Sequence, residues 1–183
     1  QVVVIDGNGC TDSSTTIVTV TALPTVTSSN AGPICLGTDV ALDETGGEAV
    51  SWTWSSLNGS ATITSTTDQS PTVSGAVDQE EFQIVIIDAN GCTDSTTTIV
   101  TVNPLPVVIA SNAGSICIGT DVVMDETGAE ATSWTWSSLN GSATITSTTD
   151  QNPTVSGAVD QEEFQVVIID ANGCTDSTTT IVT

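Results

Sequence analysis

The sequence predicts an all-β protein made of tandem antiparallel β-sandwich repeats, and three observations support this fold class. The segment DANGCTDSTTTIVT fills residues 88–101 and again 170–183, and a near copy fills 6–19, so the sequence has a period of 82 residues. Thr, Val, Ile, Ser and Gly are abundant, which favours strands and turns. No stretch has the sustained periodicity of an amphipathic helix.

The period divides the chain into three parts. Residues 24–101 and 106–183 differ at 11 of 78 aligned positions, as expected for a tandem array of small domains. We expect residues 1–22 to form the last hairpin of a truncated repeat, and 23–104 and 105–183 to form two complete repeats. Because the first residue corresponds to the middle of an expected strand, we expect the sequence to come from a longer repeat protein.

The first half of each complete repeat contains three expected strands. In the first repeat, the β-branched residues at 25–28 predict a strand that ends before a turn-forming Asn-Ala-Gly-Pro segment. Residues 38–44 alternate between apolar and polar side chains and predict a second strand. The segment Ser-Trp-Thr-Trp-Ser at 51–55 places Trp52 and Trp54 on one face of a third strand.

The second half of the repeat contains four further strands. Alternation predicts one at 61–64, β-branched residues predict a short one near 72–73, and Glu-Phe-Gln-Ile-Val-Ile-Ile-Asp at 81–88 is the strongest strand signal. Asn-Gly at 90–91 predicts a two-residue hairpin turn before the returning strand at 96–102. Seven or so short strands with frequent turns are typical of an immunoglobulin-like β-sandwich.

The few aromatic residues fit the core of such a sandwich, since its third strand usually supplies a buried Trp. The predicted core aromatic residues are Trp54, Trp136, Phe82 and Phe164. Trp52 and Trp134 are expected at the edge of each core. The alternative is that the Trp pairs form an exposed platform on which sugars stack.

Three motifs resemble a known family. They are Cys-Leu-Gly-Thr-Asp-Val-Ala-Leu at 35–42, Trp-Thr-Trp at 52–54, and Phe-Gln-Ile-Val-Ile-Ile-Asp-Ala-Asn-Gly-Cys-Thr at 82–93. They are similar to the immunoglobulin-like, PKD-related repeats of very large surface and gliding adhesins of bacteria that use type IX secretion. The chain departs from that family at Phe82 and Phe164, where Tyr is usual. The resemblance implies an extracellular location on a bacterial surface and a structural or adhesive role.

Each complete repeat has two cysteines, and a domain of this size often needs a covalent staple. We expect disulfides Cys35–Cys92 and Cys117–Cys174 within the domains, which leaves Cys10 without its partner. Each bond would contribute roughly 4 kcal/mol in the chain-entropy description. One alternative is a bridge between neighbouring domains, because the start of the second strand and the last hairpin turn lie at opposite ends of a simple sandwich. The other alternative is buried free thiols.

The charge of the chain excludes several functions. The sequence has 22 acidic residues and no Lys, Arg, His or Tyr, which gives a formal net charge of −22. Binding to nucleic acids or anionic membranes requires cationic side chains, and no apolar run is long enough to span a bilayer. Most catalytic bases and nucleophiles are also missing, so we predict no enzymatic activity, catalytic residue or cofactor-binding residue.

Two kinds of modification or ligand site are suggested by short patterns. Oxygen ligands with the spacing D-x-N-x-x-x-D could bind Ca²⁺; the candidates are Asp88, Asn90, Asp94, Asp170, Asn172 and Asp176. The alternative is that these residues shape the hairpin turn or are solvated. The Asp-Ser-Thr triplets match the short O-glycosylation signal of the same bacteria, which makes Ser95 and Ser177 candidate attachment sites.

The expected function is structural: the repeats form an extracellular stalk or filament, with neighbouring repeats or other copies of the chain as partners. One alternative is an adhesin module that binds a glycan or another cell surface. A second is a fibre of short chains that exchange the terminal hairpin. Val85 and Ile87, on the outward face of their strand, are either ordinary exposed residues or a contact surface for another chain.

Overall fold

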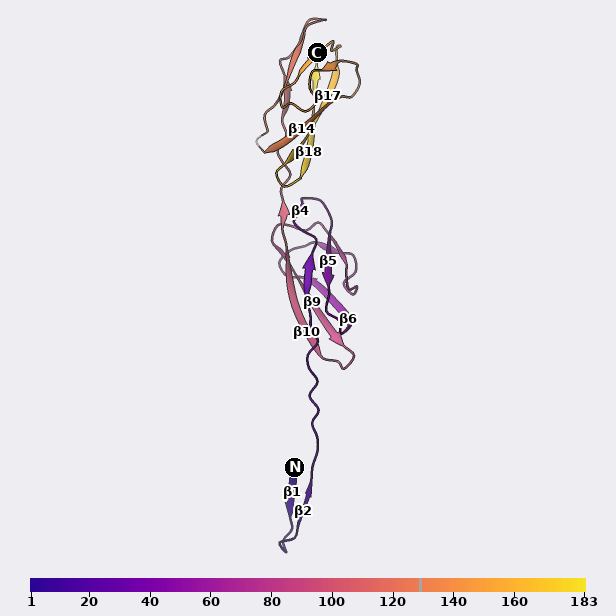
Figure 1. Cartoon of the computed structure of the whole chain (residues 1–183), viewed down its shortest axis with the longest axis vertical. Coiled ribbons are helices and arrows are strands. Elements are labelled where there is room, and N and C mark those ends of the chain that lie inside the picture. Colours follow the sequence, from indigo (N-terminus) through magenta and orange to yellow (C-terminus); the bar gives the residue numbers. More distant parts are fainter. Residues whose placement is uncertain (129) are drawn as a thin grey trace.

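The computed structural model describes residues 1–128 and 130–183, and every regular element in this part of the chain is a β-strand. An N-terminal hairpin and two β-sandwiches follow one another along a single long axis (Figure 1). The hairpin consists of β1 (Val2–Ile5) and β2 (Thr11–Ser14), paired in antiparallel register. An extended segment joins it to the first sandwich (Figure 1).

The first sandwich contains two antiparallel sheets and a short parallel pair. One sheet has the strand order β3-β5-β8-β7, the other has the order β10-β9-β6, and β4 pairs in parallel with β11. The strands are β3 (Ser28–Asn30), β4 (Ile34–Cys35), β5 (Val40–Glu44), β6 (Ala49–Ser56), β7 (Thr62–Ile63), β8 (Thr72–Ser74), β9 (Glu80–Asp88), β10 (Thr93–Val100) and β11 (Val102–Asn103).

The second sandwich repeats the two antiparallel sheets, with the orders β12-β13-β16-β15 and β14-β17-β18. Its strands are β12 (Ala110–Asn112), β13 (Val122–Glu126), β14 (Ala131–Ser138), β15 (Thr144–Ile145), β16 (Thr154–Ser156), β17 (Glu162–Asp170) and β18 (Thr175–Val182). The chain is therefore an all-β protein of immunoglobulin-like sandwiches, which confirms the predicted fold class.

Each sandwich has its own apolar core, built by the two-residue alternation of its strands. In β9 the core-facing side chains Phe82, Ile84 and Ile86 are fully buried, and the intervening residues face outward. The four predicted core aromatic residues are all buried, as expected. Trp52 is half-buried and packs against the first core, and its indole Nε1 donates a hydrogen bond to Glu44 Oε2 at 3.0 Å.

The cores also contain buried carboxylates. Glu80 is 1% exposed, and its Oε1 accepts hydrogen bonds from Ser56 Oγ at 2.7 Å and from the Ala61 amide at 3.1 Å. Its Oε2 accepts a bond from the Val77 amide at 3.1 Å. The carboxylate thus satisfies loop amides that would otherwise be buried without partners.

The observed strands differ from the predicted ones at the start of the sandwich. The first strand of the sandwich is Ser28–Asn30 rather than 25–28, and the pair Ile34–Cys35 had not been predicted as a strand. The two-residue strand forms because its backbone pairs with β11, far along the chain. Cys35 therefore lies on β4 and not at the start of β5.

The β9–β10 connection is a three-residue loop rather than the predicted two-residue turn. The Asp88 amide donates to the Cys92 carbonyl at 3.0 Å, and Gly91 has a φ of 82°. A residue in this left-handed conformation commonly closes three-residue hairpin loops, and glycine adopts it without steric cost.

Candidate functional site

The most distinctive site in the protein is the junction between the two sandwiches. Parallel pairing of β4 with β11 places Cys35 beside the segment by which the chain leaves the first sandwich. The Ile34 amide donates to the Thr101 carbonyl at 3.0 Å, and the Leu36 amide donates to the Asn103 carbonyl at 2.9 Å. These bonds fix the backbone on both sides of Cys35 at the end of the sandwich.

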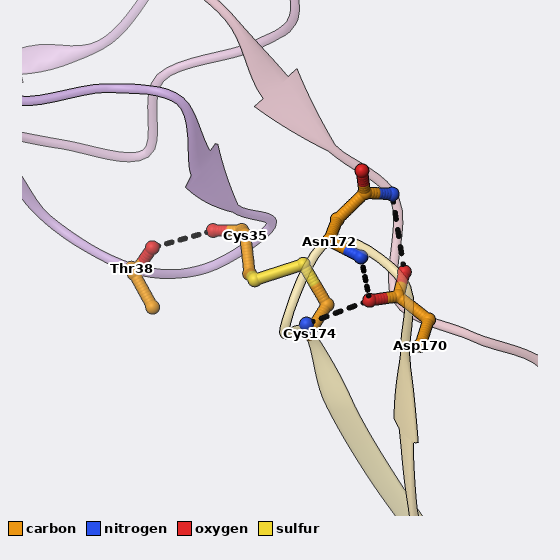
Figure 2. The surroundings of a disulfide bond; sticks show 5 residues. All are labelled: Cys35, Thr38, Asp170, Asn172 and Cys174. Atoms are coloured by element: carbon orange, nitrogen blue, oxygen red, sulfur yellow. Dashed lines mark hydrogen bonds between the residues drawn. A yellow bond between two sulfur atoms is a disulfide. The ribbon is translucent and has the colours of Figure 1, made fainter. Parts of the chain in front are cut away.

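The β17–β18 turn of the second sandwich faces this end of the first sandwich (Figure 2). Asp170 Oδ1 accepts hydrogen bonds from the amides of Asn172 and Cys174, both at 2.8 Å. The Asp170 amide in turn donates to the Cys174 carbonyl at 3.0 Å. The aspartate thereby holds the turn in the shape that presents the cysteine.

Cys35 and Cys174 form a disulfide that crosses the junction (Figure 2). Their Cα atoms are 5.5 Å apart, a usual separation for a disulfide, and the two residues are separated by 139 positions in the sequence. Cys174 is fully buried, and Thr38 Oγ1 donates to the Cys35 carbonyl at 2.6 Å. The bond covalently joins one sandwich to the next, in addition to the peptide linker.

This pairing corrects the predicted disulfides Cys35–Cys92 and Cys117–Cys174, which were wrong. Cys35 is on β4, which pairs with β11 where the chain leaves the sandwich, whereas Cys92 is in the β9–β10 turn. That turn lies at the opposite end of the sandwich (Figure 1), so the two thiols of one domain do not meet. The alternative of a bridge between neighbouring domains is the one that the structure shows. In the described part of the chain, Cys10, Cys92 and Cys117 are free thiols.

The first predicted Ca²⁺ motif lies in and beside the β9–β10 turn. Asp88 Oδ1 accepts hydrogen bonds from the amides of Asn90 and Cys92, both at 2.8 Å, while Asp94 Oδ1 accepts one from the adjacent Ser95 amide. Desolvation raises the pKa of Asp88, but hydrogen bonds from Cys92, Asn90 and Gly91 lower it by more, so its pKa lies below the ordinary value of 3.8. The carboxylate therefore supports the turn.

The second Ca²⁺ motif, Asp170, Asn172 and Asp176, has the same arrangement on the second sandwich. Among the described residues, no three cysteine or acidic side chains lie together as a metal-binding group. Ca²⁺ binding at either turn stays a prediction. Ser95 and Ser177, the candidate glycosylation sites, are both exposed, and their modification also stays a prediction.

Comparisons with known proteins concern the fold only. No protein family and no curated protein matches the sequence. Among solved structures, the I67–I69 fragment of the titin I-band is 15% identical, with 89% of this chain and 66% of that chain covered and a TM-score of 0.42. Fibronectin(III)-like modules of Clostridium thermocellum CbhA are 12% identical, with 85% of this chain and 94% of that chain covered and a TM-score of 0.38. Murine CEACAM1b is 11% identical, with 87% of this chain and 99% of that chain covered and a TM-score of 0.38.

These likenesses are too slight to support an argument about what the chain binds or does. The immunoglobulin-like assignment depends instead on the strand order of the two sandwiches. The part of the chain that the structure describes contains no helix that could cross a membrane.

Proposed function

We propose that this chain is a structural segment of an extracellular stalk or filament, in which immunoglobulin-like domains are joined end to end. The observation that carries the proposal is the Cys35–Cys174 disulfide across the junction. A bond within a domain would stabilise only that domain. A bond between domains restricts bending and keeps the two domain ends in contact when the array is pulled.

Two further properties support an extended structural role. The sandwiches follow one another along a single axis, so each added domain lengthens the molecule (Figure 1). The net charge of −22, without any basic side chain, makes domains repel one another and keeps the array extended and soluble. Lateral association of such arrays would depend on cations that screen the charge.

The extracellular location is supported by the disulfide, because such bonds persist in oxidising environments. The resemblance of the Cys-Leu-Gly, Trp-Thr-Trp and Asp-Ala-Asn-Gly-Cys motifs to surface and gliding adhesins supports a bacterial surface and export by type IX secretion. Neighbouring repeats are then the principal partners, and the segment has no catalytic role.

Immunogold electron microscopy of the source cells, with antibodies raised against the folded chain, tests this proposal. We expect the label to follow thin extended structures outside the cell envelope. Label inside the cell or on compact surface particles would overturn the proposal. Pre-immune serum and antibody absorbed with the purified chain provide the controls.

The alternative function, an adhesin module that binds glycans, lacks the aromatic platform that motivated it. The chain has four Trp and two Phe, all in the described residues, and each is buried or half-buried. The indole nitrogens are also engaged: Trp54 Nε1 donates to the Asp68 carbonyl at 3.1 Å, and Trp134 Nε1 donates to Glu126 Oε2 at 2.9 Å. Sugar stacking on Trp54 or Trp136 would require the core to open.

A further inference from the structure

The second sandwich ends in a surface equivalent to the one that binds Cys174 on the first sandwich. We call it the exit face, and its shallow hollow is lined by Ile116, Ile118, Ala158, Val159, Asp160, Val182 and Thr183. Cys117 lies between the first two of these residues in the sequence. On the first sandwich, the corresponding hollow includes Leu36, Val77 and Asp78 and lies beside the disulfide-bonded Cys35.

The exit face is exposed where its counterpart is partly covered. Ile118 is 100% exposed, whereas the equivalent Leu36 is 52% exposed. Cys117 is an exposed free thiol, whereas Cys35 is half-buried and bonded to Cys174. The same surface therefore occurs twice in the chain, once with a neighbour and once without.

The loop that presents Cys117 shares its hydrogen bonds around the cysteine with the bonded loop. The Ile116 amide donates to the Thr183 carbonyl at 2.9 Å, as the equivalent Ile34 amide donates to Thr101. Thr120 Oγ1 donates to the Cys117 carbonyl at 2.6 Å, the same bond that Thr38 makes to the carbonyl of Cys35. Docking a partner would therefore require little reorganisation of this loop.

The turn that fits such a face is also present more than once. Asp-Ala-Asn-Gly-Cys occurs at 88–92 and 170–174, and both copies have the same aspartate-to-amide hydrogen bonds at 2.8 Å. Cys174, whose turn is docked, is fully buried. Cys92, whose turn carries a free thiol, is only half-buried. The cysteine of the turn thus loses exposure when the turn meets the end of a neighbouring sandwich.

We propose that the exit face docks the Asp-Ala-Asn-Gly-Cys turn of a following repeat on the same polypeptide, and that Cys117 forms a disulfide with the cysteine of that turn. Each repeat would then bond to the repeat before it through its turn and to the repeat after it through its exit face. This inference rests on the proposed structural function and deepens it, because it makes the disulfide a regular link along the array.

The bond requires an oxidant, for which a small-molecule disulfide such as oxidised glutathione suffices. The Cys117 thiolate attacks one sulfur of the oxidant, forms a mixed disulfide and releases one thiol. The thiolate of the docked turn then attacks Cys117 Sγ and releases the second thiol. The two cysteines lose two electrons and two protons in total, and the oxidant disulfide is reduced to two thiols.

The test extends the chain by one repeat, with residues 102–183 appended after Thr183. The new turn cysteine then follows Cys117 by 139 positions, the separation that Cys35 and Cys174 have. The extended chain is refolded with oxidised glutathione, alkylated, and digested with a glutamate-specific protease. This protease separates Cys35 and Cys117 into the peptides 1–44 and 82–126, and it releases the new turn cysteine in a third peptide.

Mass spectrometry should show peptide 82–126 linked to the peptide with the new turn cysteine, and Cys10 and Cys92 alkylated. An Ile118→Asp variant should lose this link, because the substitution places a charge on the docking surface. It should keep Cys35–Cys174, because Ile118 is fully exposed and does not contribute to the core of its own domain. A Cys117→Ser variant should behave in the same way.

Two results would overturn the inference. In one, Cys117 is alkylated in the extended chain although Cys35–Cys174 has formed. In the other, Cys117 pairs between separate molecules, seen as a dimer on a non-reducing gel. If instead Cys35–Cys174 also fails to form, the junction disulfide itself is absent, and the proposed function fails together with the inference.

Discussion

Individual carboxylates have structural roles that the overall acidity of the chain conceals. Glu162 is 1% exposed, and its carboxylate accepts hydrogen bonds from Ser138 Oγ and from the amides of Ala143 and Val159. Desolvation raises the pKa of Glu162, but these three hydrogen bonds lower it by more, so that its pKa lies below the ordinary value of 4.5. The charged form is therefore the one that the fold prefers.

Replacing Glu162 by Gln should lower the free energy of unfolding by about 1–3 kcal/mol, because one carboxylate oxygen becomes an amide donor that cannot accept its hydrogen bond. Since the folded pKa is depressed, the contribution of the wild-type charge is fully present above pH 4.5 and is lost as the pH falls through the folded pKa. Urea unfolding should show that the difference in the free energy of unfolding between the wild type and the Glu162→Gln variant is smaller at pH 3 than at pH 7.

The matched control is Glu163→Gln, one residue along the same strand, where the side chain is half-buried on the outward face. It should change stability little at either pH. An equal effect of both substitutions would mean that the loss of net charge, rather than the buried hydrogen bonds, determines the result.

At the scale of elements, short connections fix how the sheets meet. The turn after β5 brings Gly46 against the start of the first sandwich, where a Cβ atom would overlap the Thr25 carbonyl oxygen and Glu44 Oε1. A Cβ atom on the adjacent Gly47 would meet nothing within 4 Å. The second repeat has Gly128 and Ala129 at the corresponding positions, so the sequence itself keeps only the first glycine.

Gly46→Ala should destabilise the first sandwich by about 1–3 kcal/mol, because the backbone of the entering segment must shift to avoid overlap. Gly47→Ala should be nearly neutral. Thermal unfolding followed by tryptophan fluorescence compares the two variants. If both variants had the same melting temperature, the backbone around Thr25 would shift without loss of stability.

Local sequence patterns could not predict pairing between strands that are distant in the sequence. The sequence predicted the long strands well, because β9 and β17 have continuous β-branched and aromatic residues. It missed β4, whose two residues carry no periodic signal and are extended because they pair with β11. The Asn-Gly signal located the hairpin turn correctly, but the Asp88–Cys92 backbone bond made the loop one residue longer than expected.

At the scale of the whole molecule, the disulfide should determine how stiff the junction is. A Cys35→Ser variant should keep both sandwiches folded, because each core is complete within its own domain. It should, however, sample a wider range of angles between the sandwiches than the oxidised wild type. Small-angle X-ray scattering should show a broader distribution of distances for the variant.

Cys117→Ser is the matched control for this measurement, since it removes a thiol that is free in this chain. Its scattering should equal that of the wild type. The N-terminal hairpin and its linker are the same in all three proteins and do not affect the comparison. If Cys35→Ser scatters like the wild type, contacts other than the disulfide hold the junction.

The repeat, the strand-rich fold and the composition of the cores could be inferred from the residues alone. These features depend on local alternation and on residue type, which are properties of short segments. Burial is different, because it requires the rest of the sandwich. Val4 is 62% exposed in the N-terminal hairpin, whereas Ile86, at the equivalent position of the first sandwich, is fully buried.

The pairing of the cysteines, in contrast, follows from the arrangement of the folded domains. The two cysteines of one repeat lie at opposite ends of a sandwich, and the turn of the next repeat brings the partner thiol to the exit end. The sequence had suggested this outcome as an alternative, because cysteines at opposite ends of one domain favour a bridge between neighbouring domains. It could not decide the pairing, because that depends on how two separately folded domains are placed at their junction.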